Sequence, residues 1–149
     1  MNALVRGAQP QDAADIAALC AELGYAGTAQ ELHQRLLCLA PLPNDWVGVA
    51  EVAGEPLLGW IHVGRRFTLQ DGQSAEILGL VTGEQVRRRG VGRALVAAAE
   101  AWARQQGALR LKVRSNIARV QSHEFYPALG FERTKTQHVY VKALTAVTP

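Results

Sequence analysis

The amino-acid sequence predicts an α/β protein with one central mixed sheet, part parallel and part antiparallel, and helices on both faces. Apolar residues alternate in some segments and recur at three- and four-residue intervals in others, so the expected order is β-α-α-β-β-β-α-β-α-β-β. Short turns join some neighbouring strands as hairpins, whereas helices join others as crossovers. Both kinds of connection in one chain require a mixed sheet.

The first half of the chain is expected to contain a strand, two helices and a hairpin. Pro10 opens the first helix and Gly24 ends it. Thr28 and Glu31 have the spacing of a capping box, which starts the second helix. The turn at 53–55 is a hairpin signal. The expected elements are a strand at 4–5, a helix at 10–24 with the buried stripe Ile16, Leu19, Cys20 and Leu23, a helix at 28–39, and strands at 46–52 and 57–67.

In the second half, a polar connection at 68–73 is expected to lead into a central apolar strand. Gly79 interrupts that strand, which indicates a bulge or the close approach of another backbone. A helix with the buried stripe Leu95, Ala98, Ala99 and Trp102 should follow. The remaining expected elements are a half-buried strand at 109–113, a helix at 118–129, and closing strands at 131–135 and 138–144.

Length and composition favour one domain over residues 1–149, because 149 residues with 48% hydrophobic content suffice for a sizeable core. No apolar run approaches the roughly 20 residues of a membrane span, and the first residues lack the order of a signal peptide. Cys20 and Cys38 have no metal-ligand spacing. We therefore expect a reduced, cytoplasmic protein without a membrane partner.

The positive charge of the chain is concentrated in one short segment. The formal net charge is +3, and four of the 16 basic residues lie within 87–93, where there is no acidic residue. A compact polyanionic ligand suits such a cluster better than nucleic acid, which needs a broader basic stripe. Binding of nucleic acid is therefore not expected.

That segment reads Arg87-Arg88-Arg89-Gly90-Val91-Gly92-Arg93 and stands between a strand and a helix. Main-chain N–H groups at the start of a helix lack partners, and the helix dipole favours anions there. The segment is not a Walker loop, which ends in Gly-Lys-Ser/Thr, nor a dinucleotide fingerprint, which has Gly at the position of Leu95. A tight turn with solvated arginines is the alternative.

Two motifs and the order of elements resemble the GNAT superfamily of acetyl-CoA-dependent N-acetyltransferases. Arg87, Gly90 and Gly92 match its Gln/Arg-x-x-Gly-x-Gly/Ala signature, and residues 125–131 (FYPALGF) match its Phe-Tyr-x-x-Leu-Gly-Phe segment. The resemblance implies acetyl-CoA as co-substrate and no metal, with the pantetheine arm along the central strand and the pyrophosphate on the glycine loop. The cofactor-binding residues it implies are Leu80, Val81, Thr82, Arg87, Arg88, Arg89, Gly90, Val91, Gly92, Arg93, Asn116 and Tyr126.

Glu76 stands where the histone acetyltransferase branch of the family has its catalytic base. An amine with a pKa of about 10.4 must lose a proton before it attacks, which costs about 4–5 kcal/mol at pH 7. In a regular strand Glu76 would share a face with Leu80 at a distance of roughly 13 Å. Glu76 would then act through a water molecule, or else serve only as a carboxylate that attracts cationic substrates.

The resemblance assigns Tyr126 as the general acid that protonates the departing CoA thiolate. A tyrosine that only packs against the cofactor is the alternative, and Asn116 is either a cofactor contact or a helix cap. His33, His62 and His138 have no partners at ligand spacing, so no metal is expected.

These features predict an acyltransferase that acetylates a primary amine of a small molecule or of a peptide or protein. An aminoglycoside-type or polyamine-type acetyltransferase is a second interpretation, although Arg114 would repel a polycation if it faced the site. The interpretation from a different class is a regulatory module that binds acetyl-CoA without turnover. Edge strands near the C-terminus would allow a homodimer.

Overall fold

The computed structural model describes residues 3–86, 90–115 and 120–145, which fall into two compact units, Met1–Arg114 and Ser115–Pro149. The second unit contains one helix, α4 (Val120–Ala128). The elements of the first unit are β1 (Leu4–Gly7), a 3-10 turn η1 (Pro10–Asp12), α1 (Ala13–Glu22), α2 (Ala29–Leu39), β2 (Asp45–Glu51), β3 (Gly59–Thr68), β4 (Gly72–Thr82), a turn η2 (Glu84–Val86), α3 (Val91–Gln105) and β5 (Leu111–Val113).

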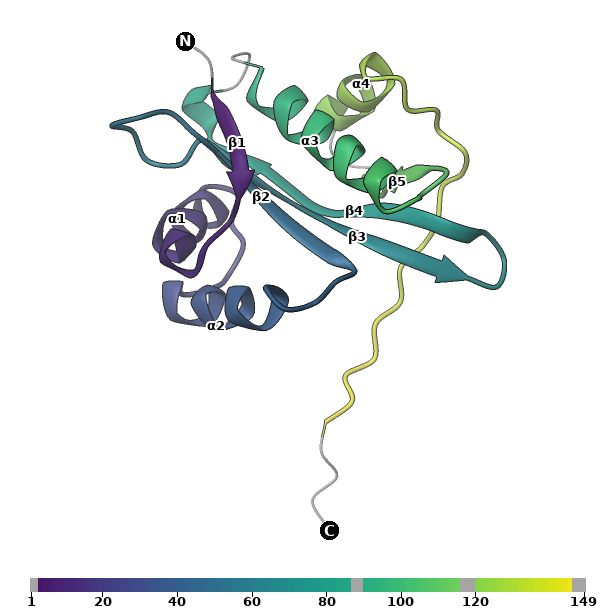
Figure 1. Ribbon diagram of the computed structural model, residues 1–149, viewed down its shortest axis with the longest axis horizontal. Helices are drawn as coiled ribbons and strands as arrows, with labels where there is room; N and C mark the ends of the chain where they lie inside the picture. Colours follow the sequence, from purple (N-terminus) through teal and green to yellow (C-terminus); the bar gives the residue numbers. More distant parts are fainter. Residues whose placement is uncertain (1–2, 87–89, 116–119, 146–149) are drawn as a thin grey trace. The chain divides into compact units, whose positions relative to one another are not determined.

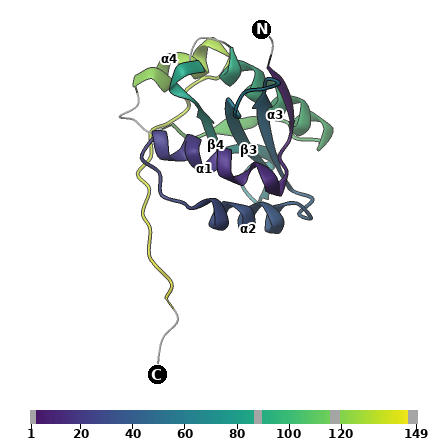
Figure 2. The ribbon, with the colours of Figure 1, turned by 90° about the vertical axis from the view of Figure 1, so that its left-hand side faces the viewer.

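The first unit is a five-stranded mixed sheet in the order β1-β2-β3-β4-β5. The first four strands pair antiparallel with their neighbours, and α3 is the crossover that brings β5 parallel to β4. Helices α1 and α2 lie against one face of the sheet and α3 lies against the other (Figures 1 and 2). The predicted mixed sheet with helices on both faces is therefore confirmed.

The two faces of the sheet bury different apolar groups. On the α1 and α2 face, the predicted stripe of α1 packs with Val49, Leu57 and Val81. On the α3 face, Ile61, Val63 and Leu95 are fully buried. A Cβ built on Gly59 would come within 3.1 Å of Leu95 Cδ1, so α3 lies directly on β3.

The local signals that predicted helix ends are confirmed. Thr28 Oγ1 accepts a hydrogen bond from Glu31 N at 3.1 Å, and Glu31 Oε1 accepts one from Thr28 N at 3.2 Å, which is the predicted capping box. Gly24, just after α1, has a φ of 78°, a left-handed conformation that favours glycine.

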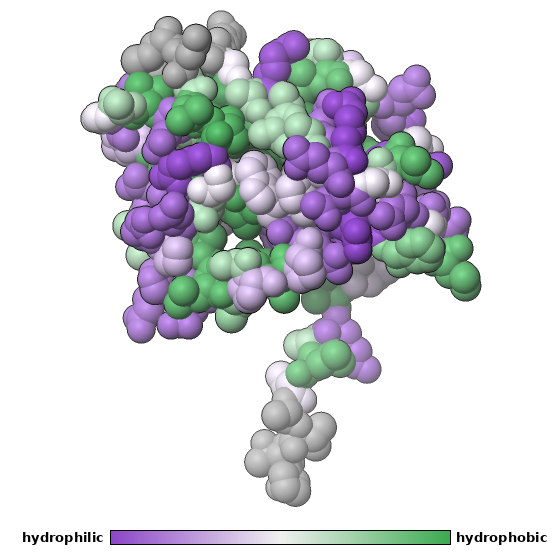
Figure 3. All heavy atoms as spheres, viewed as in Figure 1, coloured by the Kyte–Doolittle hydropathy of each residue, from purple (hydrophilic) through white to green (hydrophobic). Residues whose placement is uncertain are grey.

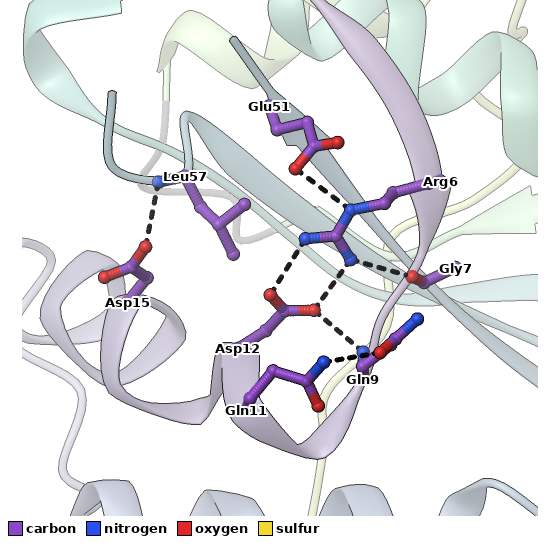
Figure 4. Close-up of polar contacts among 8 residues, drawn as sticks. All are labelled: Arg6, Gly7, Gln9, Gln11, Asp12, Asp15, Glu51 and Leu57. Carbon is purple, nitrogen blue, oxygen red and sulfur yellow. Dashed lines mark hydrogen bonds and ion pairs between the residues drawn. The ribbon is translucent and has the colours of Figure 1, made fainter. Parts of the chain in front are cut away.

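A network of charged groups ties β1 to η1 and β2 (Figure 4). Arg6 donates from Nη1 and Nη2 to the two carboxylate oxygens of Asp12 at 2.9 Å, and its Nε lies 3.0 Å from Glu51 Oε2. The hydrogen bonds from Arg6 hold the pKa of Asp12 below its usual range, with a smaller contribution from the main-chain N–H of Gln9. This network places the start of α1 on the sheet.

Replacing Asp12 with asparagine is expected to lower the free energy of unfolding by about 2 kcal/mol at pH 7, because charge-assisted hydrogen bonds are lost in a half-buried site. A lowered carboxyl pKa contributes stability above its ordinary value of about 3.9, and that stability disappears as the pH falls through the lowered value. Denaturant titrations should therefore show the difference between parent and variant shrinking towards pH 3.

Glu100→Gln is the matched control for Asp12→Asn. It removes a carboxylate from an exposed i,i+4 pair with Arg104, at 3.8 Å. Exposed pairs of this kind contribute about 0.3–0.5 kcal/mol. If Asp12→Asn costs no more than this control, the network is not what positions α1.

The connection between β3 and β4 differs from the prediction. The polar stretch 68–73 was expected to be a loop, but Thr68 pairs with Gly72, so the two strands form a hairpin with a short turn. Phe67 and Leu69 are exposed there, and apolar side chains are visible at this end of the hairpin (Figure 3). The hairpin tip thus extends past the parts of the sheet that the helices cover.

The second unit lacks the predicted strands at 131–135 and 138–144, since residues 131–145 contain neither helix nor strand. Their apolar side chains at Val139, Tyr140, Val141 and Leu144 are exposed. The alternating pattern predicted strands correctly only where a partner strand supplied hydrogen bonds, and among the described residues this segment has none.

Strand β5 is also shorter than predicted. It covers Leu111–Val113, whereas Leu109, expected to be half-buried, is exposed.

Within the described residues, no helix has the length and apolar character needed to cross a membrane.

Candidate active site

A bulge interrupts β4 at the position where Gly79 predicted one. His62 of β3 lies opposite Gly79, and the next residue, Val63, lies opposite Ile77. Leu78 therefore has no partner on β3. One extra residue in a strand reverses which side chains share a face, because successive side chains point to opposite faces.

The bulge overturns the predicted position of Glu76. Glu76 lies opposite Gly64 and shares the face of Val81, which packs under α1. Leu80 lies opposite Ile61, on the face covered by α3. The expectation that Glu76 and Leu80 share a face is therefore wrong, and the reason is the change of register at the bulge.

Around the bulge, strand pairing places four side chains on the α1 and α2 side of the sheet. A Cβ built on Gly64 would lie 3.0 Å from Asp45 Oδ1 and 3.2 Å from Leu78 Cδ1. We call this surface the bulge face and define it by Asp45, His62, Glu76 and Leu78. Leu78 is 40% exposed, so the face presents an apolar group beside two carboxylates.

Both carboxylates of the bulge face are paired with cationic or potentially cationic groups. Glu76 Oε2 lies 3.4 Å from Arg114 Nε, and Asp45 Oδ1 lies 2.9 Å from His62 Nε2. The second pair was not predicted from the sequence. The hairpin signal at 53–55 indicated that these two strands pair, but the pair of side chains depends on the register, which places Asp45 opposite Gly64, two residues from His62.

Trp60 covers the bulge from the same side. A Cβ built on Gly79 would come within 2.8 Å of two ring atoms of Trp60, so only glycine leaves room for the indole at this position. The close approach predicted at Gly79 is thus that of a side chain. Among the described residues, the buried Nε1 of Trp60 has no hydrogen-bond partner.

Beyond the bulge, one edge of β4 is open. The parallel ladder between β4 and β5 ends at the pair of Ile77 and Val113. In the part of the chain that the structure describes, residues 78–82 of β4 therefore have a neighbour only on the β3 side.

Along β4, the main-chain N–H and C=O groups of every second residue point to that open edge. Gly83 N donates to Leu58 O at 2.9 Å, so the main-chain groups of Gly83 face β3. Bonded and non-bonded pairs alternate along an antiparallel ladder, and Val81 consequently also bonds towards β3. The N–H and C=O groups of Leu80 and Thr82 face the open edge instead. An extended molecule that carries amides can pair with them.

Helix α3 begins close to this edge in the sequence and presents free N–H groups. Its N-cap is Gly90, with a φ of 77°, a left-handed conformation that glycine adopts without strain. The first helical hydrogen bond runs from Ala94 N to Gly90 O at 3.0 Å. The N–H groups of Val91, Gly92 and Arg93 have no carbonyl partner within the helix, and glycine at the N-cap has no side chain to cap them.

The turn that leads into the glycine loop is held by α1. Glu84 N donates to Glu22 Oε2 at 3.2 Å, and Gly83 packs against Leu19. The end of α1 therefore positions the chain between the open edge of β4 and the start of α3.

Tyr126 lies in α4 of the second unit and is half-buried. Its ring makes edge-on contacts with Phe125 at 5.0 Å and with Phe131 at 5.6 Å between centroids. The predicted general-acid role of Tyr126 stays a prediction. Arg87, Arg88, Arg89 and Asn116 lie outside the described residues.

Among the residues that the structure describes, no three His, Cys, Asp or Glu side chains gather in a way that could hold a metal ion.

Comparisons with known proteins show the family of the chain. Residues 13–131 match the acetyltransferase (GNAT) family. The chain is 33% identical over 135 residues to an aminoglycoside N(6')-acetyltransferase type 1 of Stenotrophomonas maltophilia, covering 88% of this chain and 87% of that protein. It is 38% identical over 131 residues to the protein of the same name from Serratia marcescens, covering 85% and 90%.

A solved structure shares the fold. The aminoglycoside acetyltransferase AAC(6')-Iy, in complex with the bisubstrate analogue CoA-S-monomethyl-acetylneamine, superposes with a TM-score of 0.83 at 18% identity, over 96% of this chain and 99% of that one.

The open edge of β4 can pair with amide groups, and the uncapped start of α3 can bind phosphates. The chain belongs to the acetyltransferase (GNAT) family. It is an N-acetyltransferase that transfers the acetyl group of acetyl-CoA to a primary amine. A regulatory module without turnover is thereby set aside.

The described main-chain groups fit this co-substrate. The open edge of β4 offers Leu80 and Thr82 main-chain groups to the amides of a pantetheine arm. The free N–H groups at the start of α3 suit a pyrophosphate, and Gly92 in the first helical turn leaves the main chain accessible.

Proposed function

We propose that the acceptor is a small amino sugar of the aminoglycoside kind, and that the acetylated group is a primary amine on it. Two relatives with that activity in their names, each matched over more than four fifths of this chain, carry the proposal. The bulge face supports it, since the carboxylate of Glu76, whose counter-ion Arg114 is exposed, can attract a cationic acceptor. A peptide or protein acceptor is the second candidate.

In the proposed reaction the neutral amine attacks the thioester carbon, the carbon–sulfur bond breaks, and the thiolate leaves. The acceptor ammonium loses one proton before the attack, and the attacking nitrogen loses a second one as the amide forms. The sulfur gains one proton, so one proton in total is released. Glu76 either accepts the first proton through a water molecule or only attracts the acceptor. Leu80, Val81 and Thr82 with the loop 87–93 would hold acetyl-CoA, and Asn116 and Tyr126 complete the proposed set.

In the proposed cofactor site, Val81 has a different role from Leu80 and Thr82. Its side chain is buried against the α1 cluster and its main chain bonds towards β3, so it keeps β4 in place rather than facing the open edge.

The two units are proposed to act as one domain, because the family match at residues 13–131 runs across the boundary between them.

We also propose a cytoplasmic location, consistent with the free thiols of Cys20 and Cys38. A homodimer is proposed on the exposed apolar residues of 138–144.

The test of the acceptor class is a thiol-release assay with acetyl-CoA and a panel of primary amines. The panel contains aminoglycosides with a 6'-amino group, glucosamine, a linear polyamine and a lysine peptide. The aminoglycosides are expected to give the highest kcat/KM, and mass spectrometry should show one added acetyl group. A peptide that outperforms every aminoglycoside would overturn the proposed acceptor.

Replacing Tyr126 with phenylalanine is expected to lower kcat roughly a hundredfold, because proton transfer by a positioned side chain contributes about 10²–10⁴-fold. Cofactor affinity should change less than about twofold, because only a hydroxyl is removed. Tyr140→Phe is the control, since Tyr140 is 90% exposed in the same unit. If Tyr126→Phe turns over as fast as the control, Tyr126 is a packing residue.

A further inference from the structure

The carboxylate of Glu76 is paired with a cationic side chain of the protein, that of Arg114. Its carboxylate is only 17% exposed, whereas the Arg114 side chain is 61% exposed, with Arg114 Nε 3.4 Å from Glu76 Oε2. Lys112 lies opposite Glu76 in β5, but its Nζ lies 4.0 Å from Asp71 Oδ2. Arg114 is therefore the nearest described counter-ion of Glu76.

An acceptor amine approaches Glu76 as an ammonium ion, because a primary amine with a pKa of about 10.4 is protonated at neutral pH. The guanidinium of Arg114 and that ammonium compete for one carboxylate. An ion pair with an exposed partner contributes little to stability, so the acceptor can displace the guanidinium. The displaced guanidinium stays within reach, and it repels every further positive charge on the acceptor.

The other carboxylate of the bulge face does not relieve this repulsion. Asp45 is 15% exposed and already bonded to His62 at 2.9 Å. Arg66 adds a further positive charge to this face, because a Cβ built on Gly64 would lie 2.8 Å from Arg66 Nη1. Its Nη1 donates to the main-chain oxygen of Arg65, so Arg66 does not replace Arg114 on Glu76.

We propose that Arg114 is a specificity-determining residue that limits the number of positive charges on the acceptor. It occupies the Glu76 carboxylate in the absence of the acceptor. It makes the KM of polycationic amines higher than it would be without Arg114, whereas the KM of singly charged amines changes little. This inference rests on the proposed amine acetylation on the bulge face.

The test compares parent, Arg114→Gln, Arg114→Lys and Arg104→Gln proteins. Arg104→Gln is the matched control, since Arg104 forms an arginine–glutamate pair with Glu100 on α3, on the opposite face of the sheet. KM is measured at two ionic strengths for two acceptors, an aminoglycoside with several amino groups and glucosamine with one. Calorimetric binding of both amines to the CoA-loaded proteins is the second measurement.

In Arg114→Gln the KM of the aminoglycoside is expected to fall about fivefold, and that of glucosamine less than about twofold. The difference should shrink at high salt, because screening weakens exposed charges. Arg114→Lys and Arg104→Gln should both resemble the parent. The inference is overturned if the ratio of the two KM values, or of the two dissociation constants, is the same in the parent and in Arg114→Gln.

Failure of the proposed acceptor class gives a different result. If parent and variant acetylate glucosamine but no aminoglycoside, the acceptor class is wrong. The charge ratio is then measured with a linear polyamine against a monoamine. If no amine is turned over, the calorimetric ratio alone decides for or against Arg114.

Discussion

Replacing Gly92 with valine is expected to weaken the binding of acetyl-CoA at least about 100-fold while leaving the fold intact. Gly92 lies in the first turn of α3, where N–H groups have no carbonyl partner within the helix. A branched side chain there would keep a pyrophosphate from approaching the main chain. Loss of two charge-assisted hydrogen bonds, at about 1.5–3 kcal/mol each, accounts for a change of this size.

The measurement is titration calorimetry with acetyl-CoA, and circular dichroism reports the fold. Ala97→Val is the control, because Ala97 is an exposed residue of the same helix and the substitution adds the same kind of branched side chain away from the helix start. Unchanged affinity in a folded Gly92→Val protein would mean that the start of α3 does not hold the cofactor.

Local sequence signals predicted those parts of the fold that depend on few neighbours. The capping box of Thr28 and Glu31 needs only four consecutive residues, and the structure contains it. The hairpin signal at 53–55 and the stripe of α1 are likewise properties of short segments. Signals of this range also led to the glycine loop and, through it, to the family.

Features that depend on pairing between strands were less predictable. The bulge was expected from Gly79, but its consequence for Glu76 requires the register of β3 on β4. The same holds for the pair of Asp45 and His62, which are 17 residues apart in the chain. Strands were expected at 131–135 and 138–144 from an alternating pattern, but these residues form no strand. An alternating pattern does not by itself supply a partner strand.

Replacing Glu76 with glutamine is expected to reveal whether this carboxylate accepts a proton or only attracts the acceptor. If Glu76 accepts the amine proton through water, the variant should be slowest relative to the parent near pH 7, by roughly 10²-fold. Near pH 10 much of an amine with a pKa of about 10.4 is already neutral, so the deficit should shrink there.

A carboxylate that only attracts the acceptor gives another pattern. Its loss should raise KM more at low salt than at high salt and leave kcat nearly unchanged.

The structure sharpens this experiment, because Arg114 shares the carboxylate of Glu76. In an Arg114→Gln background Glu76 has lost its nearest described counter-ion. A base should then still show its deficit in kcat near neutral pH when Glu76→Gln is added. An electrostatic guide should show only a larger rise in KM. pH–rate profiles of the parent, both single variants and the double variant, at two ionic strengths, separate the two roles. A KM defect that depends on salt, with kcat unaltered in both backgrounds, rejects the base and leaves Glu76 as the group for which Arg114 and the acceptor ammonium compete.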